Sequence, residues 1–138
     1  MFANEEHKKF FEEKYKEARA MGKTDVYYTS LIYTLSIAET TREHFNEIFD
    51  LKNGEVQLNA IDKAFQTDTS LKVTRLAFSL WNHSIVFDNE ESLQKEIVST
   101  HYNPSEVFCC SYAPYFYEAI KIRYPEYTGE KTNIFLDI

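Results

Sequence analysis

The stretch NPSEVFCCSYAPYFYEAIKIRYP, residues 103–125, holds both cysteines and all three prolines of the chain. Asn103 followed by Pro104 predicts a helix start, since an Asn N-cap precedes a proline whose missing N–H costs nothing there. A second helix is expected to begin at Ala113-Pro114 and to end at Pro125. Its apolar residues recur at three- and four-residue steps: Phe116, Ala119, Ile120 and Tyr124. We therefore expect a packed helix pair at the structural centre of the fold.

Further helices are predicted upstream of this pair from caps and apolar spacing. Their approximate ranges are 4–20, 26–38, 40–49, 59–65, 71–81 and 88–99. Asn4 and Asp25 supply N-caps for the first two. Thr40 with Glu43 forms a capping box for the third, and Asp88 opens a similar box for the last. The second helix is apolar nearly all round, which favours a buried helix, although its β-branched and aromatic residues also allow a strand.

The segment DLKNGE, residues 50–55, is the clearest turn in the sequence, because Asn-Gly accepts positive φ at little cost. The segments on either side are so short that they allow only a minimal two-stranded ribbon. Residues 83–87 are expected to form a loop or an extended piece. The sequence thus predicts an all-α fold of five to seven helices, with at most one small β-hairpin near Asn53-Gly54.

Composition predicts one domain over residues 1–138, with 126–138 as a loose tail or an arm. The chain has only three glycines and three prolines, and no repeat or linker divides it. A formal net charge of −7 argues against a broad nucleic-acid surface, which needs clustered lysine and arginine. No apolar run approaches the roughly 20 residues of a membrane span, and the N-terminal sequence is not a signal peptide, so we expect a cytoplasmic protein.

A polar stripe on the helix predicted at 71–81 is the most suggestive binding site. Lys72, Arg75 and Ser79 are spaced by three and four residues, and hydroxyl side chains precede the helix: Thr67, Thr69 and Ser70. Free N–H groups and hydroxyls at a helix start, with nearby cations, suit a small anion. Asp68 argues against this interpretation. Two alternatives remain open: a capped helix with a solvated stripe, or Arg75 as the buried partner of a carboxylate.

Aromatic residues and thiols supply the other candidate groups. The chain has 11 Phe and 10 Tyr, and Tyr112 and Tyr115 offer faces on which a nucleotide base can stack. Cys109 and Cys110 are adjacent, so a disulfide between them would be strained, and we expect reduced, partly buried thiols. A thiol enzyme would use Cys110 as nucleophile and His101 as base, since a thiolate needs a nearby imidazole.

Neither a metal nor a cofactor is expected. The four histidines are scattered and show no ligand spacing, and the sequence has no Gly-rich phosphate loop, GxSxG elbow or dinucleotide fingerprint. These absences make an enzyme the weaker class of function.

Three segments together resemble a family of short, uncharacterised proteins from Clostridia, Bacilli and their phages and mobile elements. The segments are DVYYTSLIYTL, QTDTSLKVTRLAFSLWN and EVFCCSYAPYFYEAIKIRYPEY. The resemblance covers roughly residues 4–127 and transfers no catalytic residue. It implies a setting in which short, acidic, cofactor-free proteins often act by binding, as inhibitors of host defence or as sponges for its nucleotide signals.

These observations give three functional hypotheses. The first is a non-enzymatic phage or mobile-element binding protein that interferes with host defence by sequestering an anionic nucleotide at the stripe and tyrosines named above. In this form, Arg75→Ala should fold normally but lose the ligand. The second is an acidic inhibitor that binds a host defence protein directly, and the third is a thiol-dependent enzyme. A homodimer is also expected, because exposed aromatic surface on a small protein is often covered by self-association.

Overall fold

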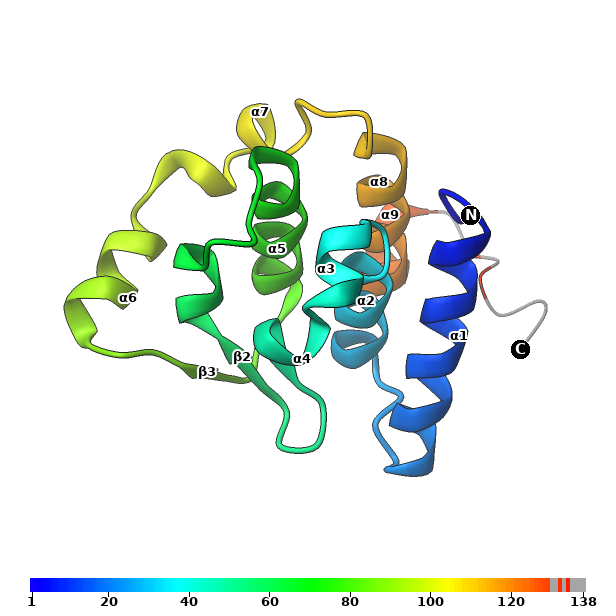
Figure 1. The fold of residues 1–138 in the computed structure, drawn as a ribbon. Coiled ribbons are helices and arrows are strands. Elements are labelled where there is room, and N and C mark those ends of the chain that lie inside the picture. The colour runs from blue at the N-terminus through cyan, green and yellow to red at the C-terminus, as the bar shows by residue number, and fades with distance from the viewer. Residues whose placement is uncertain (130–131, 133, 135–138) are drawn as a thin grey trace.

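Nine α-helices and three short strands make up the part of the chain that the computed structural model describes, residues 1–129, 132 and 134 (Figure 1). The longer helices are α1 (Glu5–Ala20), α2 (Val26–Leu35), α5 (Asp68–Leu80), α6 (Glu90–Ile97) and α8 (Ala113–Arg123). The short ones are α3 (Glu39–Glu43), α4 (Phe45–Ile48), α7 (Pro104–Val107) and α9 (Pro125–Thr128), with 3-10 turns η1 (Leu58–Asp62) and η2 (Thr100–Tyr102). The strands are β1 (Phe49–Asp50), β2 (Glu55–Gln57) and β3 (Ser84–Val86).

Helix α2 lies at the centre and contacts α1, α5 and α8 (Figure 1). Every residue from Thr29 to Leu35 is buried, as its apolar sequence predicts. Its buried hydroxyls bond to backbone carbonyls, some within the helix and some outside it: Thr34 Oγ1 donates to Ser30 O at 2.7 Å, and Tyr33 Oη donates to Met1 O. This satisfies polar groups that would otherwise be costly to bury. The centre of the fold is therefore α2, on which α8 of the predicted helix pair packs, whereas α7 is a single turn.

The helix caps are predicted with mixed success. Asn4 and Asp25 accept from the backbone N–H groups of His7 and Tyr28, as expected. The box at Thr40 is wrong, because α3 begins at Glu39 and its N-cap position makes no side-chain bond. The helix predicted at 88–99 is capped by Asn89 rather than by Asp88. Asn103 holds the N-cap position of α7, as predicted, but its side chain makes no capping hydrogen bond.

The sheet corrects the prediction of at most one hairpin. Strands β1 and β2 pair antiparallel around Gly54, with Phe49 opposite Val56, which confirms the predicted hairpin. Strand β3 then pairs parallel with β2, with Ile85 opposite Val56, so the order is β1-β2-β3. The fold is mostly helical, as predicted, but has a three-stranded sheet and more helices than expected. Sequence reasoning missed β3 because it is only three residues long and all three are exposed.

The C-terminal residues that the structure describes are ordered against the core. Thr132 Oγ1 donates to Glu118 Oε1 at 2.7 Å, and Ile134 is 2% exposed. Helix α9 occupies the start of the predicted tail. The rest of that prediction, residues 130, 131, 133 and 135–138, lies outside the described residues. Among the helices that are described, none has the length and apolar character to cross a membrane.

Candidate functional site

Two adjoining cavities lie between α5, α6 and the η1 turn. The first, about 260 Å³, is almost entirely apolar and is lined by Leu58, Phe78, Ser79, Ile85, Leu93, Glu96, Ile97 and Tyr102. The second, about 340 Å³, is polar and is lined by Leu58, Asn59, Ile61, Asp62, Arg75, Asp88, Ser92, Lys95, Glu96, Ser99 and His101. Because both include Leu58 and Glu96, we describe them together as the α5–α6 groove.

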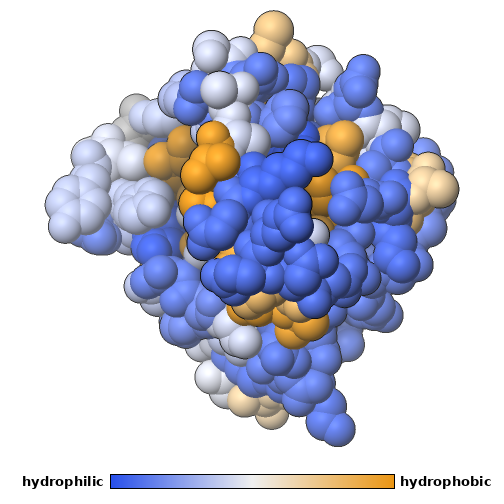
Figure 2. All heavy atoms as spheres, turned by 90° about the vertical axis from the view of Figure 1, so that its left-hand side faces the viewer, coloured by the Kyte–Doolittle hydropathy of each residue, from blue (hydrophilic) through white to orange (hydrophobic). Residues whose placement is uncertain are grey.

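Apolar side chains are exposed around the apolar half of this groove. On β3 and just after it, the exposed fractions are 36% for Ile85, 40% for Val86 and 36% for Phe87, and on α6 Ile97 is 58% exposed. Val98, the next residue, is 74% exposed. Figure 2 views the side of the molecule that carries α6 and β3, and hydrophobic patches lie there between hydrophilic residues. Such clustering on one face is typical of an interaction surface.

An ion pair fixes the wall between the two halves. Arg75 on α5 binds Glu96 on α6 through two hydrogen bonds, Nη2 to Oε1 at 3.2 Å and Nε to Oε2 at 3.3 Å. Tyr102 Oη donates to the same carboxylate at 3.2 Å. Burial, with the charge of Glu96, raises the pKa of Tyr102 above its usual range, so its hydroxyl stays a donor at neutral pH. The three side chains therefore hold α6 against α5.

The residues predicted at the start of α5 form its cap. Thr67 Oγ1 accepts from Ser70 N at 3.0 Å, and Ser70 Oγ accepts from Thr67 N at 2.7 Å, a complete capping box. Thr69 is half-buried in the first turn. The helix thus begins at Asp68, three residues before the predicted Leu71. Thr67 and Ser70 cap the helix, which corresponds to the capped-helix alternative rather than to an anion site.

The cations of the predicted stripe also have partners. Lys72 Nζ donates to Glu106 O at 2.6 Å, and Arg75 binds Glu96, as the buried-partner alternative expects. Ser79 Oγ donates to Leu76 O at 2.7 Å and lines the apolar cavity. The structure therefore brings two residues of the predicted stripe, Arg75 and Ser79, to the groove.

The predicted tyrosines lie elsewhere. The ring of Tyr115 packs edge-on against His7 of α1, with centroids 6.3 Å apart, whereas Arg75 reaches α6 on the other side of α5 (Figure 1). Tyr112 is half-buried at the start of α8 and packs on the core. Cys109 is exposed and Cys110 half-buried, and both are free thiols. In the part of the chain that the structure describes, no three His, Cys, Asp or Glu side chains gather as a metal site.

Comparison with known proteins places the chain in a family. Residues 1–135 match the model of DUF6075, described as a family of unknown function. The chain belongs to this family. No curated protein and no solved structure matches it. Membership in DUF6075 agrees with the resemblance to a family of uncharacterised proteins, and the proposed source in Clostridia, Bacilli and phages stays a prediction.

Sequence reasoning missed most of the groove in this DUF6075 chain. Leu93 and Ile97 lie within the helix predicted at 88–99, and Ile85 lies within the loop or extended piece predicted at 83–87. The signal for an unpartnered surface was the run from Ile85 to Phe87 followed by an amphipathic helix rich in acids. Sequence alone does not show that this surface lacks a partner within the fold.

Replacing Arg75 by Ala is expected to lower the free energy of unfolding by about 2 kcal/mol, because it leaves the largely buried Glu96 carboxylate without its cation. This differs from the sequence hypothesis, in which the variant folds normally. Urea denaturation measures the change. Lys72→Ala, one turn away with an exposed ammonium, is the control and should cost less than about 1 kcal/mol. Equal losses in both variants would show that Arg75 has no special structural role.

Proposed function

We propose that this DUF6075 chain is a non-enzymatic binding protein whose α5–α6 groove receives an extended segment of a partner protein. The single observation that carries the proposal is the apolar cavity of about 260 Å³ that lies beside exposed apolar side chains of β3 and α6. A cavity of this size accepts one or two apolar side chains. Proteins bind peptides by such pockets when an apolar anchor enters and the chain continues along the surface.

Strand β3 offers the second means of attachment. It is the last strand in the order β1-β2-β3, so one of its edges has no neighbour within the sheet. All three of its residues are exposed. A segment laid along that edge gains main-chain hydrogen bonds, while alternate side chains point toward the cavity. The geometry therefore favours an extended segment.

The charged residues at the rim of the α5–α6 groove indicate which residues a partner segment should carry. Asp88, Glu90 and Glu91 are exposed at the start of α6, against the single cation Lys95 on the same helix. We therefore expect apolar residues flanked by lysine or arginine. A second copy of the chain would place the same carboxylates opposite one another, which disfavours a dimer through this face.

The second sequence hypothesis, direct binding of a host defence protein, fits this surface best. Its acidic and aromatic character corresponds to the rim carboxylates, Phe87 and Tyr102. Interference with host defence is part of the proposal and rests on the family resemblance. A charge-steered complex of this kind should weaken as salt concentration rises.

Ile97→Asp is expected to abolish peptide capture, because it places a carboxylate at the mouth of the apolar cavity. The measurement is selection of a displayed library of random dodecapeptides on the immobilised full-length protein, followed by titration of the enriched peptides. We expect enriched sequences that combine an apolar anchor with Lys or Arg, and a loss of at least roughly tenfold in affinity for the variant.

Tyr127→Asp is the matched control, since Tyr127 is 82% exposed on α9 and lies outside the groove. It introduces the same acid in place of an exposed apolar residue and should leave affinity unchanged. Peptides without positive charge, or peptides that bind Ile97→Asp as well as the parent, would contradict the proposal. Sedimentation of the parent protein shows whether it forms a homodimer. If that dimer forms through the α5–α6 groove, Ile97→Asp should abolish it.

A further inference from the structure

Helix α6 forms one wall of the α5–α6 groove but is weakly joined to the rest of the fold. None of its residues is buried. Figure 1 shows it at the outer edge of the molecule, and the segments that join it to β3 and η2, residues 87–89 and 98–99, are largely exposed. A helix with so little buried surface gains little free energy from its position against the core.

A single carboxylate makes the polar contacts that hold α6 in place. Among the residues that the structure describes, Glu96 makes every hydrogen bond and ion pair between residues 88–99 and the remainder of the chain, with Arg75 and Tyr102 as its partners. The side chains of Arg75 and Glu96 are each 13% exposed, so solvent screens their attraction only in part. We call these three side chains the latch.

The space beneath α6 is incompletely filled. The apolar cavity of about 260 Å³ is lined by Leu93 and Ile97 from α6, by Phe78 from α5 and by Ile85 from β3. Side chains that line a cavity have fewer packing partners than those of a close-packed interior, and they gain less dispersion energy. Outward movement of α6 therefore sacrifices little packing apart from that of Leu93, and its main cost is the latch.

We propose that α6 is a lid, which opens at the latch to admit the apolar side chain of the partner segment and then closes over it. This role of α6 depends on the binding function proposed above for the groove. An apolar side chain in the cavity supplies Leu93 and Ile97 with packing partners, so it stabilises the closed position. The partner thus shifts an equilibrium that exists in the free protein.

The opening is tested on the free, full-length protein by ¹³C-methyl relaxation dispersion, which detects a minor conformation on the microsecond-to-millisecond timescale. We expect the methyl groups of Leu93 and Ile97 to exchange at one common rate, whereas those of the buried Leu31 on α2 show no such exchange. Glu96→Gln removes the charge of the latch. It should raise the open population at least roughly tenfold, the factor that the loss of a charge-assisted hydrogen bond gives.

Glu13→Gln is the control, because it makes the same substitution at an exposed position of α1. It should leave the exchange of Leu93 and Ile97 unchanged. Tyr102→Phe keeps the ion pair and should raise the open population less than Glu96→Gln does. Thermal unfolding shows whether each variant keeps its fold, and Tyr102→Phe carries the test if Glu96→Gln does not fold. The lid is refuted if the parent shows no exchange, or if neither latch variant changes it.

The closing step is tested with a peptide enriched on the immobilised protein. Saturation with this peptide should abolish the methyl exchange of Leu93 and Ile97. Because the lid opens both for entry and for release, Glu96→Gln should raise the association and dissociation rate constants by a similar factor and change the affinity less than about twofold.

The two proposals can fail separately. A peptide that binds a free protein without methyl exchange would overturn the lid and leave the binding function in place. Latch-dependent exchange in a protein that captures no peptide would overturn the binding function, and with it the closing step, while the opening of α6 would stand.

Discussion

Acidification from about pH 7 to about pH 4 is expected to lower the free energy of unfolding by about 3 kcal/mol through His7 alone. His7 is fully buried, and burial lowers its pKa from 6.5 to about 4. Its Nδ1 accepts from Ala3 N at 3.0 Å and its Nε2 lies 3.1 Å from Tyr33 O, so the neutral ring carries its proton on Nε2. A second proton would bind Nδ1, which would then be a donor that faces the donor N–H of Ala3 and could no longer accept its hydrogen bond.

The sign of this change in the free energy of unfolding follows from proton binding in the two states. Unfolded His7 takes up a proton below pH 6.5, whereas folded His7 does so only near pH 4. The contribution to stability is therefore complete above pH 6.5 and is lost as the pH falls toward 4. Denaturant titrations between these values measure it.

His7→Gln is the control, because its amide can still donate to Tyr33 O but does not titrate. We expect the parent to lose stability more steeply than this variant as the pH falls from 6.5. Parallel stability profiles, or an NMR titration of the His7 ring with a pKa near 6.5, would refute the prediction.

Gly54→Ala is expected to lower the free energy of unfolding by about 3 kcal/mol, from backbone strain and overpacking together. Gly54 has a φ of +65°, which disfavours any residue with a Cβ atom. A Cβ atom there would also collide with the hydroxyl of Tyr28, whose ring packs edge-on against Trp81 with centroids 5.0 Å apart. The collision therefore extends to the ring cluster under the hairpin.

Gly22→Ala separates the two causes. Gly22 has nearly the same φ, +73°, but nothing lies within 4 Å of a Cβ atom built there, so only the backbone strain of about 1 kcal/mol is expected. Tyr28→Phe combined with Gly54→Ala should recover part of the loss by removing the hydroxyl. Thermal or urea unfolding measures all three variants. Equal losses at the two glycines would show that the contact with Tyr28 does not matter.

Some local signals in the sequence predicted local structure correctly. Asn4 and Asp25 cap helices because a side-chain oxygen reaches an N–H only three residues away. Asn53-Gly54 marks the hairpin, although only the glycine adopts positive φ, while Asn53 bonds to Asp50. In each case the relevant partners lie within a few residues.

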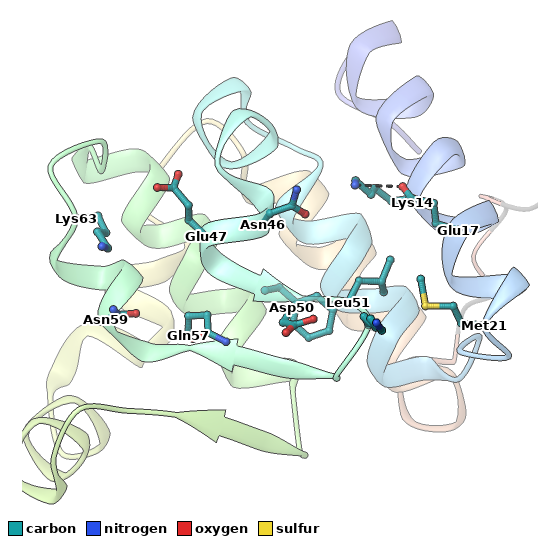
Figure 3. A pocket seen from close by; sticks show the side chains of 12 residues that line it. Lys14, Glu17, Met21, Asn46, Glu47, Asp50, Leu51, Gln57, Asn59 and Lys63 are labelled. Atoms are coloured by element: carbon teal, nitrogen blue, oxygen red, sulfur yellow. Dashed lines mark ion pairs between the residues drawn. The ribbon is translucent and has the colours of Figure 1, made fainter.

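Features that depend on distant partners were not predictable. Arg75 meets Glu96 across 21 residues and two helices, so the sequence left a bound anion, a solvated stripe and a buried carboxylate open as explanations. The third strand pairs with residues almost thirty positions earlier in the chain, and its exposed side chains lack the alternation that identifies a half-buried strand. A mixed-charge hollow between α1, α4, the β1–β2 hairpin and η1 combines segments about forty positions apart, and no sequence motif joins them (Figure 3).

The parallel pairing of β2 with β3 also sets an order of events during folding. A parallel pair needs a crossover, and η1 and α5 lie between β2 and β3 in the chain, so we expect this non-local pairing to form late. We therefore expect the wall of the α5–α6 groove to be among the last parts to assemble, and its exposed strand to open at a lower free-energy cost than the buried helices. Amide hydrogens of β3 should thus exchange with solvent well before those of α2. A partner bound in the groove would cover strand β3. Its binding should therefore slow the exchange of the β3 amide hydrogens with solvent.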